Sequence, residues 1–169
     1  PFFAAFQPHT FTPLWLSFIL VVNALCFKRT GRCMMLNRTR YFLLLFPTSA
    51  LFWWFFEYLN RFVQNWSYTG VHYSSFEYFC YATLSFSTVL PAVLGTQELI
   101  SSFSCIHHGF ANIRLFKTPF PKVLAWTTLA ISGIGLACIG IWPDYLFSLL
   151  WISPLLIIVS IQSLTSKVH

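Results

Sequence analysis

Long apolar runs alternate with short polar segments along the whole chain. A bilayer core about 30 Å thick needs roughly 20 apolar residues in a helix, so this pattern predicts transmembrane helices. Five are expected, over about residues 11–27, 41–62, 75–100, 121–142 and 145–164. They would form one all-α transmembrane domain over residues 1–169, a polytopic helix bundle.

Prolines and small residues indicate where these helices bend and touch. The hydroxyls of Thr48 and Ser49 can bond carbonyls that Pro47 frees within the second span. Pro91 is expected to kink the third span, and Asn23 to bond a neighbouring helix. Small residues recur at helical spacing in the third and fourth spans, which predicts that these spans pack closely together. The two stripes are Ser85, Thr88, Ala92 and Gly95, and Ala130, Gly133, Ala137 and Gly140.

Composition supports a membrane environment. Of the 169 residues, 57% are hydrophobic and only 8% are charged, whereas a soluble domain carries about 25% charged residues. So few charges could not cover a soluble surface. The chain begins with Pro rather than Met, so we expect a fragment or a processed product.

The positive charges predict an orientation. Nine of the ten Lys and Arg residues fall in segments that five spans would place on one side, and Arg61 falls on the other. The positive-inside rule then puts the N-terminus outside and the C-terminus in the cytoplasm. The net charge of +6 is therefore interpreted as a topology signal, and no nucleic-acid partner is expected. The nine are Lys28, Arg29, Arg32, Arg38, Arg40, Arg114, Lys117, Lys122 and Lys167.

Cysteine and histidine spacing does not indicate a metal site. The five cysteines are odd in number and lack a CxxC pair, so neither a disulfide framework nor zinc is indicated. His107 and His108 are adjacent, and adjacent residues point to different faces of a helix. No metal or other cofactor is expected.

One stretch, residues 53–77, concentrates polar groups between apolar runs, at what would be the outer interface. It holds two of the chain's four acidic residues, Glu57 and Glu77, which are the candidate catalytic groups. Glu57, Asn60 and Arg61 share one helix face by their spacing. The candidate substrate-binding residues are Asn60, Arg61, Asn65, Trp66, Tyr68 and His72.

Two interpretations of this stretch remain open. In the structural one, Glu57 pairs with Arg61 one turn on, and Glu77 caps its own helix. In the functional one, Glu57, Glu77 and His72 converge under a lid of aromatic side chains. One carboxyl group could then protonate an apolar substrate while another group removes a proton.

Three segments, PLWLSFILVVNAL, RTGRC and FWWFFEYLNRFVQNWSYTGV, resemble a family of small, uncharacterised bacterial integral membrane proteins. This resemblance covers the first two-thirds of the chain and implies the bacterial inner membrane. More distantly, the order of polar residues is similar to that of membrane-embedded lycopene cyclase domains, in which acidic residues drive redox-neutral cyclisation of a carotenoid. That family shows a Pro-x-Glu-Glu pair where this chain has Ser75-Phe76-Glu77-Tyr78. The matching positions are Glu57, Asn60, Trp66, Tyr68, Gly70, Val71 and Glu77.

These observations lead to two functional hypotheses. The first is a multi-pass membrane protein whose outer-interface site binds or acts on a lipid or isoprenoid of the carotenoid type by redox-neutral acid/base chemistry. The alternative is a non-catalytic scaffold or accessory subunit of a membrane complex, with a membrane protein as its partner. A transporter is less favoured, because the ionisable groups cluster at span ends and no internal repeat is evident. No motif fixes a reaction.

Overall fold

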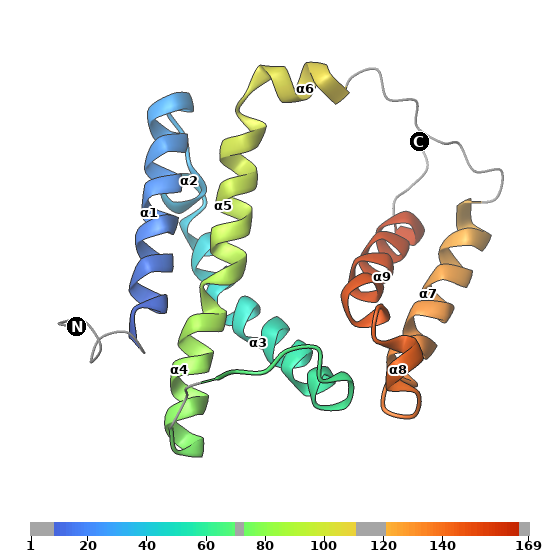
Figure 1. Ribbon diagram of the computed structural model, residues 1–169. Coiled ribbons are helices and arrows are strands. Elements are labelled where there is room, and N and C mark those ends of the chain that lie inside the picture. Colours follow the sequence, from blue (N-terminus) through green and yellow to red (C-terminus); the bar gives the residue numbers. More distant parts are fainter. Residues whose placement is uncertain (1–8, 70–72, 111–120, 166–169) are drawn as a thin grey trace. The chain divides into compact units, whose positions relative to one another are not determined.

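The computed structural model describes residues 9–69, 73–110 and 121–165, and every regular element within them is a helix (Figure 1). The all-α prediction is therefore confirmed for this part of the chain. The helices are α1 (Phe11–Thr30), α2 (Met34–Asn37), α3 (Thr39–Val63), α4 (Ser75–Ser87), α5 (Val89–Ser101), α6 (Ser104–Phe110), α7 (Pro121–Ala137), α8 (Pro143–Leu146) and α9 (Leu149–Thr165).

Three helical segments are long and apolar enough to cross a membrane: α1, α3, and α4 with α5 taken together as Ser75–Ser101. The structure thus indicates a helical membrane protein. The predicted fourth and fifth spans correspond to α7 and α9, apolar helices of 17 residues each. A helix of that length extends about 25 Å, less than the roughly 30 Å core. Five spans and their orientation stay predictions.

The described chain divides into two compact units. The first contains Pro1–Phe55 and Tyr68–Ile113, and the second contains Phe56–Ser67 and Arg114–His169. Each unit is described by itself. The prediction of one transmembrane domain remains a prediction.

In the first unit, α1 runs parallel to α4 and α5 (Figure 1). The hydroxyls of Thr12 and Ser85 are 3.2 Å apart near one end of this pair. At the other end, the Arg29 guanidinium donates to the Ser102 carbonyl, with N–O distances of 3.4 and 3.5 Å. Both contacts join residues 73 positions apart, so the two helices keep one register along their length.

The small-residue stripe of the third span faces protein, as predicted, and its neighbour is α1. Thr88, Ala92 and Gly95 are buried. A Cβ atom on Gly95 would lie 3.3 Å from Asn23 Nδ2 and 3.6 Å from a Val22 methyl group. A small residue at this position therefore lets α5 approach α1 closely.

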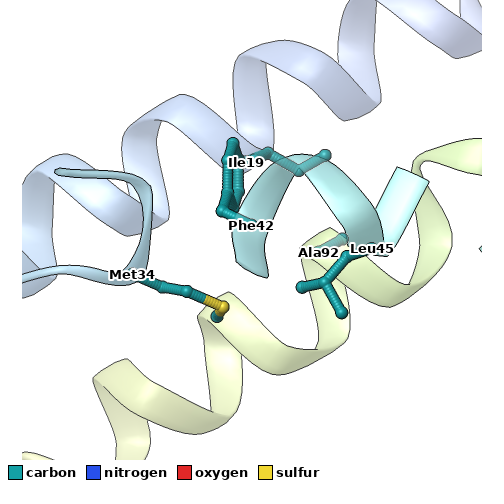
Figure 2. Packing of buried hydrophobic residues seen from close by; sticks show 5 residues of the cluster. All are labelled: Ile19, Met34, Phe42, Leu45 and Ala92. Carbon is teal, nitrogen blue, oxygen red and sulfur yellow. The ribbon is translucent and has the colours of Figure 1, made fainter. Parts of the chain in front are cut away.

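The core of the first unit draws on four helices (Figure 2). Ile19 comes from α1, Met34 from α2, Phe42 and Leu45 from α3, and Ala92 from α5. All five are buried. Their contacts hold the short helix α2 and the start of α3 against the α1–α5 pair.

A buried amide adds polar links to this core. Asn23 in α1 is 1% exposed. Its Oδ1 accepts the Met35 N–H of α2 at 3.2 Å, and its Nδ2 donates to the Ile19 carbonyl at 2.9 Å. The predicted bond from Asn23 to a neighbouring helix is confirmed.

The third span breaks at Thr88, between α4 and α5, three residues before Pro91. A proline N atom cannot donate, so Pro91 leaves the Ser87 carbonyl without its usual helix bond. At the break, Ser49 of α3 donates to the Phe86 carbonyl and accepts the Leu90 N–H. The prediction that Ser49 bonds a carbonyl freed within its own helix is therefore wrong. Thr48 does bond its own helix, at the Leu44 carbonyl.

In the second unit, α7 packs along α9. The buried residues of α7 are Ala125, Ser132 and Gly135, and a Cβ atom on Gly135 would collide with the Leu149 side chain of α9. The predicted stripe through Gly133 lies on a different face, where all four of its residues are exposed. Periodicity identified small residues in this helix, but not the face that packs on α9. The predicted packing of that stripe against the third span stays a prediction.

Candidate functional site

The candidate site begins at the end of α3, where the chain turns back on the helix. Gln64 follows the last helical residue and has a φ of 48°, in the left-handed region. Its N–H donates to the Asn60 carbonyl at 2.8 Å. This conformation ends the helix and brings the next residues back over its last turns.

Asn60 holds the returning segment by its side chain. Its Nδ2 donates to the Trp66 carbonyl at 2.8 Å, and its Oδ1 accepts the Trp66 N–H at 3.3 Å. One amide group thus satisfies both backbone polar groups of Trp66, which would otherwise need water or a helix partner. The loop is fixed at this residue.

The clamp at Trp66 places its indole against Glu57. Trp66 Nε1–H donates to Glu57 Oε1 at 2.9 Å. The Glu57 side chain is half-buried, whereas Arg61 is exposed. The indole of Trp66 is thus one partner of the Glu57 carboxylate. The expected ion pair between Glu57 and Arg61 stays a prediction.

The indole that bonds this carboxylate belongs to a group of aromatic rings. The Trp66 ring lies 5.3 Å from that of Trp151 in α9, and Phe56 stacks on Trp151 with a centroid distance of 5.5 Å. Trp66 also packs against the buried cluster of the second unit, which includes Leu59, Ile139 and Leu150. Glu57 therefore lies beside an apolar, aromatic group.

Glu77 has a different local role. Its Oε2 accepts the Ser74 N–H at 2.9 Å and the Ser74 hydroxyl at 2.8 Å, while its own N–H donates to Ser74 Oγ at 3.3 Å. This reciprocal arrangement is a capping box at the start of α4. The helix-capping interpretation of Glu77 is confirmed.

The predicted site residues are therefore brought together only in part. Glu57, Asn60 and Trp66 form one bonded group in the second unit, and Asn65 lies exposed beside them. Glu77 belongs to the first unit, as does Tyr68, whose ring lies 6.2 Å from that of Tyr78. His72 lies outside the described residues. The predicted convergence of Glu57 with Glu77 stays a prediction.

This arrangement is suited to holding a loop. An indole N–H only donates and does not ionise near neutral pH, so the Glu57–Trp66 contact is not a proton relay. Within the described ranges, no three His, Cys, Asp or Glu side chains gather closely enough to hold a metal ion.

Sequence reasoning missed a second polar group, in the first unit. Glu98 Oε2 accepts the Met34 N–H at 2.8 Å, and Glu98 and Arg38 both line a small hollow between α5 and the segment that leads into α3. In the sequence, Arg38 is interpreted only as one of the positive charges that predict the orientation. One signal in the sequence could have indicated this group. Glu98 is an acidic residue near the end of the third span, and its charge is opposite to that of the basic segment at residues 28–40.

Comparisons with known proteins assign no family to this chain. The resemblances rest on the short segments quoted above and on the order of polar residues around Glu57 and Glu77. They stay predictions. No protein-family model, no curated protein and no solved structure matches the chain.

Proposed function

We propose that the protein acts without catalysis, as a multi-pass membrane scaffold or accessory subunit of a membrane complex. The observation that carries this proposal is the bonding of Trp66 by Glu57 and Asn60. The side chains that would have to meet a substrate instead hold a loop at the end of α3. Glu77 is likewise used to cap α4.

The proposal includes five spans, with the N-terminus outside and the C-terminus in the cytoplasm of a bacterial inner membrane. The parallel course of α1 and α4–α5 supports it, because three crossings would then bring Thr30 and Ser102 to the same side. The packed pair of α7 and α9 would add two crossings as a hairpin. The positive-charge bias gives the orientation.

A second candidate is the binding or acid/base conversion of a lipid or isoprenoid at the outer interface. The position of Glu57 supports it, because this half-buried carboxylate bonds the indole of Trp66, whose ring in turn lies against that of Trp151. Apolar, aromatic walls with a few polar groups are typical of sites for such ligands. This candidate requires Glu57 to exchange its indole partner for a substrate.

Glu57→Gln separates the two candidates. The amide oxygen still accepts the indole N–H, but the group no longer ionises. We expect the variant, purified from its native membranes, to keep the parent's melting temperature and the same set of co-purified lipids by mass spectrometry. Ser67→Ala serves as the control, since Ser67 is exposed next to Trp66 and is not among the candidate site residues. Loss of a bound isoprenoid from Glu57→Gln alone would favour the acid/base site.

A further inference from the structure

A hollow of about 200 Å³ lies in the first unit, between the segment that leads into α3 and the last turns of α5. Its wall carries both signs of charge. Arg38 and Tyr41 line it from the α3 side, and Gln97 and Glu98 line it from α5. It lies at the end of the unit where α1 ends and α2 begins.

Glu98 is fixed in this wall. Its Oε2 accepts the Met34 N–H at 2.8 Å, and the side chain is half-buried. Arg38 is exposed, and among the side chains that the structure describes it forms no ion pair with Glu98, although both line the hollow. A cation and an anion thus face one space without neutralising each other.

Another cation near this end of the unit is engaged elsewhere. Arg29 donates to the Ser102 carbonyl, and its guanidinium carbon lies 3.8 Å from the centre of the Phe103 ring. This combined hydrogen bond and cation–π contact ties the end of α1 to the residues after α5. Among the described residues that line the hollow, the positive charge belongs to Arg38.

We propose that this hollow binds the headgroup of a phospholipid that carries a primary ammonium, of the phosphoethanolamine type. The guanidinium of Arg38 would bind the phosphate, for which its planar fork of donors is suited. The Glu98 carboxylate would accept N–H bonds from the ammonium, which a quaternary ammonium cannot donate. The hollow is smaller than the roughly 300–1,000 Å³ of pockets for drug-sized ligands, which fits a headgroup alone.

The occupant is a membrane lipid because an apolar groove adjoins the hollow. This groove of about 440 Å³ is lined by Trp15 and Phe18 of α1 and by Val93 and Ile100 of α5. Gln97 lines both the groove and the hollow. A headgroup in the hollow can therefore extend an acyl chain into the groove, whereas a soluble phosphate ester would leave the groove empty.

Lipid retention by the full chain tests this proposal. The protein is reconstituted into nanodiscs with equal amounts of dioleoyl phosphatidylethanolamine, phosphatidylglycerol and phosphatidylcholine, then released into mild detergent for native mass spectrometry. We expect the amount of retained phosphatidylethanolamine to be about ten times that of either other lipid. This is the ratio that one charge-assisted hydrogen bond provides. Equal retention of the three lipids would overturn the proposal.

Three variants assign the headgroup contacts. Glu98→Gln keeps an acceptor for the Met34 N–H but removes the charge, so the preference for phosphatidylethanolamine over phosphatidylcholine should fall to near one. Arg38→Gln changes an exposed side chain and should lower retention of every phospholipid by about tenfold. Arg40→Gln is the matched control, since Arg40 does not line the hollow, and should behave as the parent.

Two further results would contradict the proposal. The first is unchanged lipid retention in Arg38→Gln, which would contradict the phosphate contact. This variant decides by itself if the size-exclusion profile shows that Glu98→Gln does not fold. Soluble phosphoethanolamine or inorganic phosphate at millimolar concentration should not displace the bound lipid. Displacement by either would mean that the hollow binds a soluble phosphate and not a lipid headgroup.

Discussion

Ser49 of α3 replaces the helix hydrogen bond that Leu90 of α5 lacks. In a continuous helix the Leu90 N–H would bond the Phe86 carbonyl, four residues earlier. Here the Ser49 hydroxyl accepts the Leu90 N–H at 3.0 Å and donates to the Phe86 carbonyl. One buried side chain thus bonds two backbone groups at the break in this span, which lipid could not do.

Removal of this hydroxyl should destabilise the first unit. Ser49→Ala leaves the Leu90 N–H without its partner and removes one of the two N–H or O–H donors to the Phe86 carbonyl, the other being the Thr88 N–H. We expect this to cost about 1–3 kcal/mol in the free energy of unfolding. The measurement is thermal or denaturant unfolding in detergent. Thr48→Ala is the matched control, because that exposed hydroxyl bonds its own helix. Equal stability of the two variants would contradict this role for Ser49.

Two glycines of α7 should respond differently to the same change. Gly135→Leu introduces a side chain where even a Cβ atom meets Leu149, so we expect a loss of about 2 kcal/mol or more. Gly133→Leu should cost little, because nothing lies within 4 Å of a Cβ atom there. Detergent melting temperatures and size-exclusion profiles compare the pair. Greater damage from Gly133→Leu would mean that this exposed face packs against protein in the membrane.

Sequence patterns predicted the helices better than their contacts. Long apolar runs identify spans because the bilayer requires about 20 apolar residues, and α1 and α3 begin and end close to the predicted bounds. The break at Thr88 was assigned to Pro91 alone, since the hydroxyl that inserts there comes from Ser49, which is 41 positions from Leu90. Spacing within one helix cannot reveal a partner on another helix.

Asn60 should control the order of the loop after α3. Asn60→Leu removes both bonds to the Trp66 backbone, with an expected loss of about 1–3 kcal/mol. The loosened turn should also expose the bond after Arg61 to trypsin. Asn65→Ala is the control, because Asn65 is exposed and should change neither quantity. Unchanged proteolysis in Asn60→Leu would show that other contacts order this loop.

Helical spacing in the sequence predicted only part of the candidate site, because it describes one helix and not the loop that follows it. Helical spacing correctly placed Glu57 and Asn60 on one face, and both bond Trp66. Spacing did not predict the bond between Glu57 and Trp66, because it depends on the left-handed Gln64, which turns the chain back and brings the indole to the carboxylate. A single positive φ at a non-glycine residue is not visible in a hydrophobic pattern.

The orientation of the chain is open to direct labelling. The structure changes the choice of reporter, because Cys33 is 1% exposed and would resist reagent from either side. Cys105 in α6 is exposed and follows the third span, and Thr69 is exposed on the loop before that span. The two positions should therefore lie on opposite sides of the membrane.

A membrane-impermeant maleimide added to intact cells should label Thr69→Cys in a background where Cys80, Cys105 and Cys138 are replaced by serine. In a background where only Cys80 and Cys138 are replaced by serine, it should not label Cys105 until the membrane is opened with detergent, because nine of the ten positive charges predict a cytoplasmic location for that side. Labelling after lysis is the control for reactivity. The reverse pattern would invert the topology and place the Glu57–Trp66 group on the cytoplasmic side, while labelling of both positions in intact cells would mean that Ser75–Ser101 does not cross the membrane.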